Sequence, residues 1–327
     1  MKTMFKYPSI EQFRHTVKDV ENKECSKEIT FNRTVKLHGS NAAVVLDIES
    51  GEVYAQSRNR IITPEDDNAG FAKYVEENKE ELKGIIEKYT KYYGDDTNPS
   101  HVVIYGEWCG EGIQRGVAVN KLPKMFVVFD VRIVHNSNLE ISFFEKSVEI
   151  INLSFQEPSI SLYNIFKFDS RYITLNFANP VELQQELLKD VQDVELECPV
   201  AAHFGVFGVG EGYVYTSNCG KYKFKVKGEK HTVSKTKVMT AEESEAMSAV
   251  ADFVIDTVTE VRLNQGIEYL KEMNLPIENK SLGEYIKWVV TDLLKEEGDL
   301  VEELKLNPKA VNKQVSKVAR LFFQSQL

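Results

Sequence analysis

The sequence predicts an α+β protein in two parts, a mixed α+β domain over residues 1–238 and a small all-helical domain over residues 239–327. Short apolar or β-branched runs bounded by turn residues recur through the first part, as strands require. Near residue 240 these runs give way to helix-start signals and to apolar faces with helical spacing. The charge balance changes as well, because residues 239–327 contain ten Lys or Arg against sixteen Asp or Glu.

The N-terminal part is predicted to open with a short helix followed by strands. Ser9 and Gln12 have the spacing of a capping box, and Ile10, Phe13 and Val17 would form one apolar helix face. Strands are then predicted at residues 29–35, 42–48 and 53–57, with a hairpin turn at residues 49–51.

The middle of the chain alternates helix and strand patterns. Apolar residues with helical spacing predict a helix over residues 71–93. Residues 143–197 are predicted to be mixed helix and loop, and Asn179 with Pro180 opens a helix within them. Further strands are predicted at residues 101–105, 125–134, 204–215 and 221–226.

The last part is predicted to be helical because each signal in it starts a helix. Two capping boxes are present, Thr240 with Glu243 and Ser281 with Glu284. Asn307-Pro308 opens another helix, whose apolar face is formed by Val311, Val315, Val318 and Phe322.

Composition bounds the class of protein. The chain of 327 residues is 42% hydrophobic and 28% charged, which is typical of a soluble globular protein of one or two domains. Its net charge of −10 argues against a nonspecific nucleic-acid coat but leaves room for a local basic groove. The four cysteines have no metal-site spacing and are expected to be free thiols in a reducing compartment. Without a signal-peptide or membrane-spanning run, a soluble cytoplasmic protein is expected.

Lys36 is the candidate nucleophile. It ends a predicted strand and precedes the turn segment His38-Gly39, so its amine could point into a cleft and bond covalently to a nucleotide. The pattern Lys-x-x-Gly occurs five times, at Lys36, Lys91, Lys225, Lys280 and Lys295. Each of these lysines taken alone is expected to be a solvated side chain. The residues that follow Lys36 along the chain single it out.

Lysines alternate with apolar residues over residues 221–227. This alternation places Lys221, Lys223, Lys225 and Lys227 on one face of a strand. Such a face could neutralise phosphates and lower the pKa of a neighbouring lysine amine. The alternative is a solvated edge strand whose lysines prevent aggregation.

Two glutamates stand beside glycines at predicted strand ends, Glu107 after Gly106 and Glu211 before Gly212. A carboxylate at such a turn can hold a ribose hydroxyl or a metal ion, and Mg²⁺ is commonly bound through one or two carboxylates with substrate phosphates. The alternative for either glutamate alone is a solvated loop carboxylate. Phe129, in another predicted strand, is either a core residue or a ring that stacks on a base.

Three other site classes are excluded. The glycine-rich residues 205–212 are followed by a strand pattern, whereas a dinucleotide fingerprint requires a following helix. No Gly-Lys-Ser/Thr phosphate loop is present, and no Ser or Cys lies in the context of a nucleophile elbow.

Taken in chain order, these segments resemble the covalent nucleotidyltransferase superfamily of ligases and capping enzymes, and more closely the RNA ligase 2 family. Residues 36–41 resemble the nucleophile motif, including its histidine and asparagine. The later segments follow in family order, at residues 57–60 (arginine motif), 105–107 (ribose), 126–130 (adenine stacking), 211–214 (metal) and 224–227 (lysine pair). The helical end also fits this family, since capping enzymes and most DNA ligases carry an OB barrel there.

The resemblance implies a nucleotidyltransferase domain with antiparallel sheets and an ATP-dependent RNA ligase. Lys36 would attack the α-phosphate of ATP to form lysyl-AMP, AMP would pass to an RNA 5′-phosphate, and a 3′-hydroxyl would displace it. The resemblance assigns catalytic roles to Lys36, Arg58, Lys225 and Lys227. It assigns nucleotide contacts to these four and to Val35, His38, Gly39, Asn41, Glu107 (ribose) and Phe129 (adenine), and Mg²⁺ or Mn²⁺ binding to Glu211.

The implied partner is RNA, as a duplex with a nick or break that the helical domain engages, and the implied state is a monomer without membrane contact. A virus-encoded protein acting in a host cell fits equally. Several alternatives stay open, namely a guanylyltransferase that caps RNA, a ligase acting on DNA or hybrid strands, and a non-catalytic RNA-binding protein. Which lysine of residues 221–227 contacts which phosphate also stays open.

Overall fold

The structure, a computed structural model, describes residues 2–327 apart from 25, 68, 94–98, 136–137, 145–154 and 232–245. It divides into two compact units, Met1–Gly228 and Glu229–Leu327. The domain boundary predicted near residue 238, and the capping box predicted at Thr240, lie outside the described residues. Among the helices that are described, none combines the length and the apolar character needed to cross a membrane.

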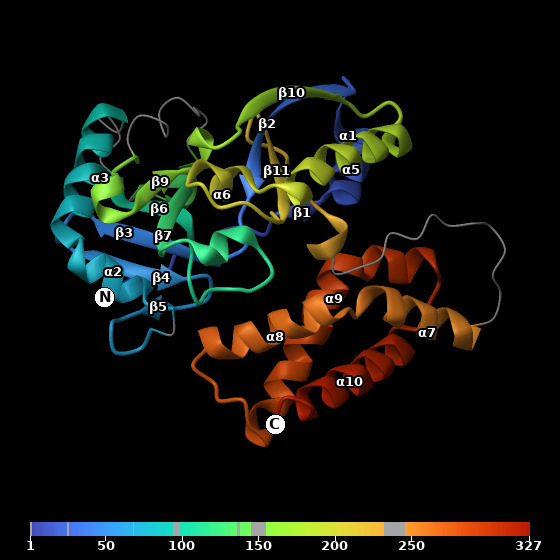
Figure 1. Cartoon of the computed structure of the whole chain (residues 1–327). Helices are drawn as coiled ribbons and strands as arrows, with labels where there is room; N and C mark the ends of the chain where they lie inside the picture. The colour runs from blue at the N-terminus through green and yellow to red at the C-terminus, as the bar shows by residue number, and fades with distance from the viewer. Residues whose placement is uncertain are drawn as a thin grey trace. The chain divides into compact units, whose positions relative to one another are not determined.

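The first unit contains a five-stranded sheet, here called sheet A, in the order β1-β12-β11-β2-β10. Its strands are β1 (Glu11–Gln12), β2 (Glu28–Lys36), β10 (Arg171–Asn176), β11 (Gly212–Ser217) and β12 (Lys223–Lys227). Helices α1 (Phe13–Lys23) and α5 (Pro180–Leu196) pack on its outer face, where alternate residues such as Phe31 and Phe224 are fully buried (Figure 1). The same alternation places Lys36 and the lysines of β12 on the inner face.

A second sheet of seven strands, here called sheet B, has the order β5-β4-β3-β6-β7-β8, and β9 pairs with β7. Its strands are β3 (Ser40–Asp47), β4 (Val53–Ser57), β5 (Ile61–Ile62), β6 (Pro99–Cys109), β7 (Met125–His135), β8 (Asn138–Phe144) and β9 (Leu162–Asn164). Helices α2 (Phe71–Glu77) and α3 (Lys79–Tyr93) cover its outer face (Figure 1). The N-terminal residues Phe5 and Tyr7 pack on its inner face.

A β-bulge in β7 sets which side chains reach the inner face. Tyr105 of β6 pairs with Asp130 and Gly106 pairs with Val128, so Phe129 is the extra residue of β7. The bulge shifts the strand alternation by one residue. Val128 therefore packs in the outer core of sheet B, whereas Phe129 and Asp130 both face inward.

The second unit is helical throughout its described residues. Its helices are α7 (Ala246–Thr257), α8 (Glu260–Glu272), α9 (Leu282–Glu303) and α10 (Pro308–Gln324). Their apolar faces form one core, which includes Leu270, Tyr285 and Val315. The remaining described elements are the short helix α6 (Pro199–His203) of the first unit and 3₁₀ turns in both units, η1 (Ala118–Lys121), η2 (Pro158–Ile160), η3 (Ile165–Lys167), η4 (Glu229–His231) and η5 (Asn279–Ser281).

The α+β class and most of the predicted strands are confirmed, and three predictions of helices and strands are wrong. The helix predicted over residues 71–93 is interrupted at Asn78 and forms α2 and α3. The strand predicted from residue 204 begins only at Gly212, and residues 171–176 form β10 within a segment predicted to be helix and loop.

The predicted capping boxes also differ from the structure. Residues 11–12 form β1, which pairs in parallel with β12, so Ser9 precedes a strand and caps no helix. Ser281 is the N-cap of α9, but its side chain makes no capping hydrogen bond. At Ser9 the pairing of β1 with β12 decides the local conformation. The predicted cap of α10 does form, with Asn307 accepting from the Lys309 N–H.

Candidate active site

Lys36 and Glu211 lie side by side at the ends of two antiparallel strands. Lys36 is the last residue of β2, and its partner in register is Gly212, the first residue of β11. The Lys36 Nζ atom lies 2.6 Å from Glu211 Oε2, and Lys227 Nζ lies 3.1 Å from the other carboxylate oxygen. His38 Nδ1 lies 3.6 Å from Glu211 Oε2. The predicted nucleophile Lys36 and the predicted lysine Lys227 therefore both contact the carboxylate of the predicted metal ligand, Glu211.

Gly212 lets β11 lie close to β12, the strand that carries Lys227. Its φ of +150° is unfavourable for residues with a side chain, and a Cβ atom there would lie 2.1 Å from the Val226 carbonyl oxygen. Just after the end of β12, the Gly228 N–H donates a hydrogen bond to the Glu211 carbonyl oxygen. Glu211 is thus fixed by backbone contacts on both sides.

The charge state of Glu211 follows from its neighbours. The side chain is 1% exposed, and burial by itself opposes ionisation. The positive charges of Lys36, Lys227 and His38 outweigh burial and hold the pKa of Glu211 far below its usual range. The result is a buried carboxylate that stays ionised and that faces cationic groups.

Glu107 holds the turn that follows Lys36. Its Oε1 atom accepts a hydrogen bond of 2.8 Å from the Gly39 N–H. A Cβ atom at Gly39 would lie 2.5 Å from the Trp108 carbonyl oxygen, so only glycine lets this turn approach the end of β6. Burial raises the pKa of Glu107 to about 7, although the charge of Lys36 lowers it in part. Glu107 thus lies within the field of the candidate nucleophile.

The structure separates the four lysines of residues 221–227. Lys221 pairs with Glu24, at an exposed position. Lys223 pairs with Asp130 at 2.6 Å, and Lys227 pairs with Glu211. Lys225 lies between Lys223 and Lys227 on the same face of β12, because Phe224 and Val226 are buried on the other.

A polar link joins Lys223 to sheet B and to the N-terminal segment. The Tyr7 hydroxyl donates to Asp130 Oδ2 at 2.7 Å, and Lys223 contacts both groups. Burial and the nearby Asp130 charge raise the pKa of Tyr7 well above its ordinary value, so the hydroxyl remains a donor. The Tyr7 ring packs edge-on against Phe129 at 5.1 Å. The link therefore connects the lysine strand to the strand of the predicted stacking ring.

The remaining predicted residues lie around this core in different ways. Asn41 is in register with Glu107 across β3 and β6. Arg58 lies beyond β4, 3.4 Å from the Ser9 hydroxyl, and its charge lowers the pKa of Glu107. The Val35 side chain is buried in the outer core of sheet A, so only its backbone can contribute to a site on the inner face.

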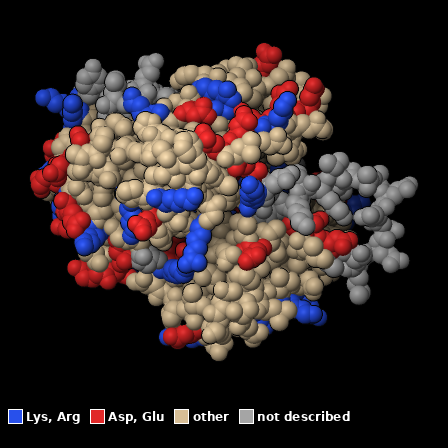
Figure 2. Space-filling model, in the orientation of Figure 1, with Lys and Arg blue, Asp and Glu red and all other residues tan. Residues whose placement is uncertain are grey.

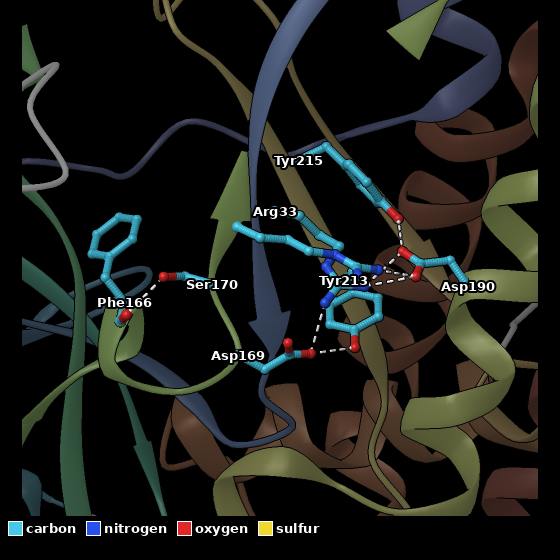
Figure 3. A network of polar contacts seen from close by, with 8 residues as sticks. Arg33, Phe166, Asp169, Ser170, Asp190, Tyr213 and Tyr215 are labelled. Carbon is cyan, nitrogen blue, oxygen red and sulfur yellow. Dashed lines mark hydrogen bonds and ion pairs between the residues drawn. The ribbon is translucent and has the colours of Figure 1, made fainter. Parts of the chain in front are cut away.

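A network behind the site was missed by the sequence analysis. Arg33 is 2% exposed, pairs with Asp169 and Asp190 at 2.7 Å each, and stacks 3.7 Å from the Tyr213 ring centre (Figure 3). The Tyr213 and Tyr215 hydroxyls donate to Asp169 and Asp190 respectively. The network ties two strands to α5, namely β2, which ends at Lys36, and β11, which begins directly after Glu211.

One sequence signal could have indicated this network. Arg33 shares a strand face with the apolar residues Phe31 and Val35, where a charged group requires a buried partner. Asp190 likewise falls within the apolar stripe of α5, three residues after Leu187. Two charges of opposite sign, each on an apolar face, predict a pair.

On the surface, basic and acidic side chains are interspersed among large uncharged areas on the face shown in Figure 2. In the part of the chain that the structure describes, no three His, Cys, Asp or Glu side chains cluster in the manner of a protein-only metal site. Any metal ion at Glu211 would take further ligands from substrate or water.

A buried carboxylate between two lysines, next to a turn held by a second glutamate, is the arrangement expected of a nucleotidyltransferase site. The family model described as RNA ligase matches residues 30–227. This chain belongs to the RNA ligase family. The family predicted from the ordered motifs is therefore confirmed.

Solved structures of RNA ligase from Naegleria gruberi are similar to this protein, and the similarity covers 70% of this chain. A lysine-to-methionine variant with AMP and Mn is 16% identical with a TM-score of 0.47, and a lysine-to-alanine variant with ATP and Mn is 17% identical with a TM-score of 0.46. The ligase with PPi is 18% identical with a TM-score of 0.44. The match spans 58% of the Naegleria chain in each case. Among curated protein sequences, none matches this chain.

Proposed function

We propose that this protein is an ATP-dependent RNA ligase that joins a 3′-hydroxyl to a 5′-phosphate through a lysyl-AMP on Lys36. The observation that carries the proposal is the convergence of Lys36 and Lys227 on the buried Glu211 carboxylate, within the residues that match the RNA ligase family. A nick in duplex RNA is the proposed substrate, the helical unit is proposed to engage it, and a monomer is the proposed active form.

The first chemical step is displacement at phosphorus. The Lys36 amine, after losing a proton, forms an N–P bond to the α-phosphorus of ATP, and the bond to the pyrophosphate oxygen breaks. Lys225, Lys227 and Arg58 would balance the negative charge that the phosphate oxygens carry, as positioned cations do in phosphoryl transfer. The RNA 5′-phosphate then takes AMP from Lys36, and the 3′-hydroxyl attacks this phosphate and releases AMP.

The residues around Lys36 would bind and orient the nucleotide. Phe129, which the bulge turns to the inner face, would stack on adenine. Glu107 would accept a hydrogen bond from a ribose hydroxyl. The turn through His38 and Gly39 and the nearby Asn41 would line the phosphate side, together with the Val35 backbone. Preformed strand ends hold these groups in place before the substrate binds, which reduces the entropy cost of the reaction.

Glu211 fits a divalent metal ion. An ionised carboxylate is an oxygen ligand that suits Mg²⁺ or Mn²⁺, with phosphates and water completing the coordination. When bound, the ion would neutralise phosphate charge and compete with Lys36 for the carboxylate. Glu211 itself would hold the Lys36 amine in position at the strand end.

Labelling tests the proposal. Incubation with α-³²P-ATP and Mg²⁺ should transfer label to the protein, and peptide mapping should locate it on Lys36. Lys36→Ala should lose the label while remaining folded, as circular dichroism would show. Label from GTP in place of ATP would indicate a capping-type guanylyltransferase, and RNA binding without any adduct would indicate a non-catalytic protein.

Glu211→Gln separates the role of the carboxylate from that of the lysine. Removal of one preorganised charged group at such a site typically costs about 10²–10³ in rate, so adduct formation should slow by at least about 100-fold. Glu52→Gln, at an exposed ion pair with Lys2, is the control. An unchanged dependence of the rate on Mg²⁺ concentration would contradict the assignment.

A further inference from the structure

The charges of the helical unit are unevenly divided. The 17 residues of α10 contain four Lys or Arg and no Asp or Glu. Residues 239–307, the rest of the predicted helical domain, contain six Lys or Arg against sixteen Asp or Glu. A single basic helix in an otherwise acidic unit requires an explanation, because random surface charge would mix the two signs.

The four cations of α10 share one exposed face. They are Lys309, Lys313, Lys317 and Arg320, all exposed and here called the α10 basic face. At 100° per residue they fall within about 80° of the helix circumference, and at 1.5 Å per residue they extend over about 16 Å. The opposite side of the helix is fully buried in the core of the unit, through Val311, Val315, Ala319 and Phe323.

Within the described part of the chain, the α10 basic face has no acidic partner. Three lysines elsewhere in the unit pair with neighbouring carboxylates, namely Lys271 with Glu268, Lys280 with Glu278 and Lys287 with Glu284. No ion pair or hydrogen bond joins the side chains of the α10 basic face to any residue that the structure describes. Four like charges within about 16 Å repel one another, and a polyanion relieves that repulsion.

We propose that the α10 basic face binds the phosphate backbone of the RNA substrate. The proposal rests on the proposed ligase function, since it names the surface by which the helical unit holds the RNA. Lysines and arginines bind phosphates by neutralising charge and releasing counterions, without reading sequence. The face therefore supplies affinity and orientation for RNA of any sequence, while the Lys36 site performs the chemistry.

A membrane surface fits the helix less well. An interfacial helix inserts its apolar face into the lipid boundary. In α10 that face is already occupied by the core of its own unit, so lipid contact would require the unit to open. RNA requires only the exposed cations.

The test compares two double variants of the full chain that change net charge equally. Lys313→Gln with Lys317→Gln removes half of the α10 basic face. Lys280→Gln with Lys287→Gln removes two lysines that are also exposed in the same unit but pair with Glu278 and Glu284. Fluorescence anisotropy with a nicked RNA duplex gives Kd as a function of NaCl concentration, and melting temperatures confirm folding.

The expected result is a Kd that rises at least about tenfold at about 0.1 M NaCl for the α10 variant only. Its plot of log K against log salt should be shallower by about one unit for each lysine removed. Equal effects in the two double variants, or an unchanged slope, would overturn the proposal. Binding to phosphatidylserine vesicles but not to RNA would assign the face to a membrane instead.

The failure of this inference can be distinguished from failure of the proposed function. Labelling of Lys36 by ATP needs no RNA, so the α10 variant should label at the wild-type rate. If the wild-type protein forms no adduct yet the α10 variant loses RNA binding, the ligase function fails and the surface stands. If labelling is normal and RNA binding is unaffected by the variant, only the surface assignment fails.

Discussion

At the scale of single residues, the site is organised by how its few buried charges are paired. Glu211 is shared by Lys36 and Lys227, so one carboxylate fixes both lysines. Glu107 is kept next to this group by its bond to the Gly39 N–H. For both carboxylates, burial raises the pKa and nearby cations lower it. The cations dominate at Glu211, whose pKa is lowered, and burial dominates at Glu107, whose pKa is raised.

Glu107 should make stability fall as pH rises. Its folded pKa of about 7 lies above the ordinary value of 4.5, so between these values the folded state keeps a proton that the unfolded state has lost. The stability of the folded state therefore decreases as pH rises through this window and levels off above about pH 7. Glu107→Gln, which preserves the acceptor for Gly39, should gain melting temperature relative to wild type between about pH 5 and pH 8. A difference in melting temperature between the two proteins that stays constant across that pH range would contradict the prediction.

Lys223 should position the nucleotide without taking part in the chemistry. Lys223→Gln breaks the pair with Asp130 and loosens the link between β12 and β7, so the KM for ATP in adduct formation should rise about tenfold, or about 1.4 kcal/mol. The maximal rate should stay within about threefold of wild type. Lys221→Gln, at the exposed pair with Glu24, is the matched control. A large fall in rate at saturating ATP would instead make Lys223 a phosphate ligand.

At the scale of elements, strand ends and one bulge position the site. β2 and β11 bring Lys36 and Glu211 together by their register, and the bulge at Phe129 turns two consecutive side chains of β7 toward β12. The Arg33 network fastens β2 and β11 to α5 on the outer face (Figure 3). A rigid outer face lets the inner face carry charged groups in fixed positions.

Arg33 and Arg171 offer a matched pair for testing this network. Both lie 2.7 Å from Asp190, but the Arg33 side chain is 2% exposed and that of Arg171 is 55% exposed. Arg33→Met removes the buried guanidinium that bonds both Asp169 and Asp190, and it should cost about 2–3 kcal/mol of unfolding free energy. Arg171→Met should cost no more than about 1 kcal/mol. Urea unfolding of the two variants checks the difference, and equal losses would show that burial does not set the strength of this network.

At the scale of the whole molecule, two units with separate cores divide the chain. The first unit contains every residue of the candidate active site, and the second contains the α10 basic face. Each unit buries its own apolar clusters, as separately folding domains do. Chemistry at Lys36 and binding of RNA are therefore expected to be separable.

Truncation tests this division of work. A protein ending at Gly228 should still form the ATP adduct, at a rate within about tenfold of the full chain, because each site residue is retained. It should seal nicked RNA at least about 100-fold more slowly, since RNA must be held while two further displacements occur at its 5′-phosphate. Circular dichroism confirms that the truncated chain is folded. Sealing at the full-length rate would show that the helical unit is dispensable.

Much of the site was predictable from the sequence because its motifs are short and local. Periodicity predicted the strands around Lys36 and a two-faced strand at residues 221–226, which is β12 (Lys223–Lys227) in the structure. The order of motifs predicted the family, which is confirmed. Helix starts whose cap bonds to a residue close in sequence were also predicted correctly, as for Asn307, which accepts from the Lys309 N–H. In each case the interacting residues are sequence neighbours, so the pattern itself contains the contact.

Tertiary structure alone decided which groups of the site pair with each other. Lys223 and Asp130 are 93 residues apart and Lys36 and Glu211 are 175 apart, so strand register and the bulge at Phe129 determine those contacts. The same holds for β1, whose two residues carry no strand signal and which becomes a strand by pairing with β12. The residues of β10 include the strand formers Tyr172, Ile173 and Thr174, and its pairing with β2 decides that they form a strand. Sequence sets which face of an element a residue occupies, whereas only the packing of elements determines what that face meets.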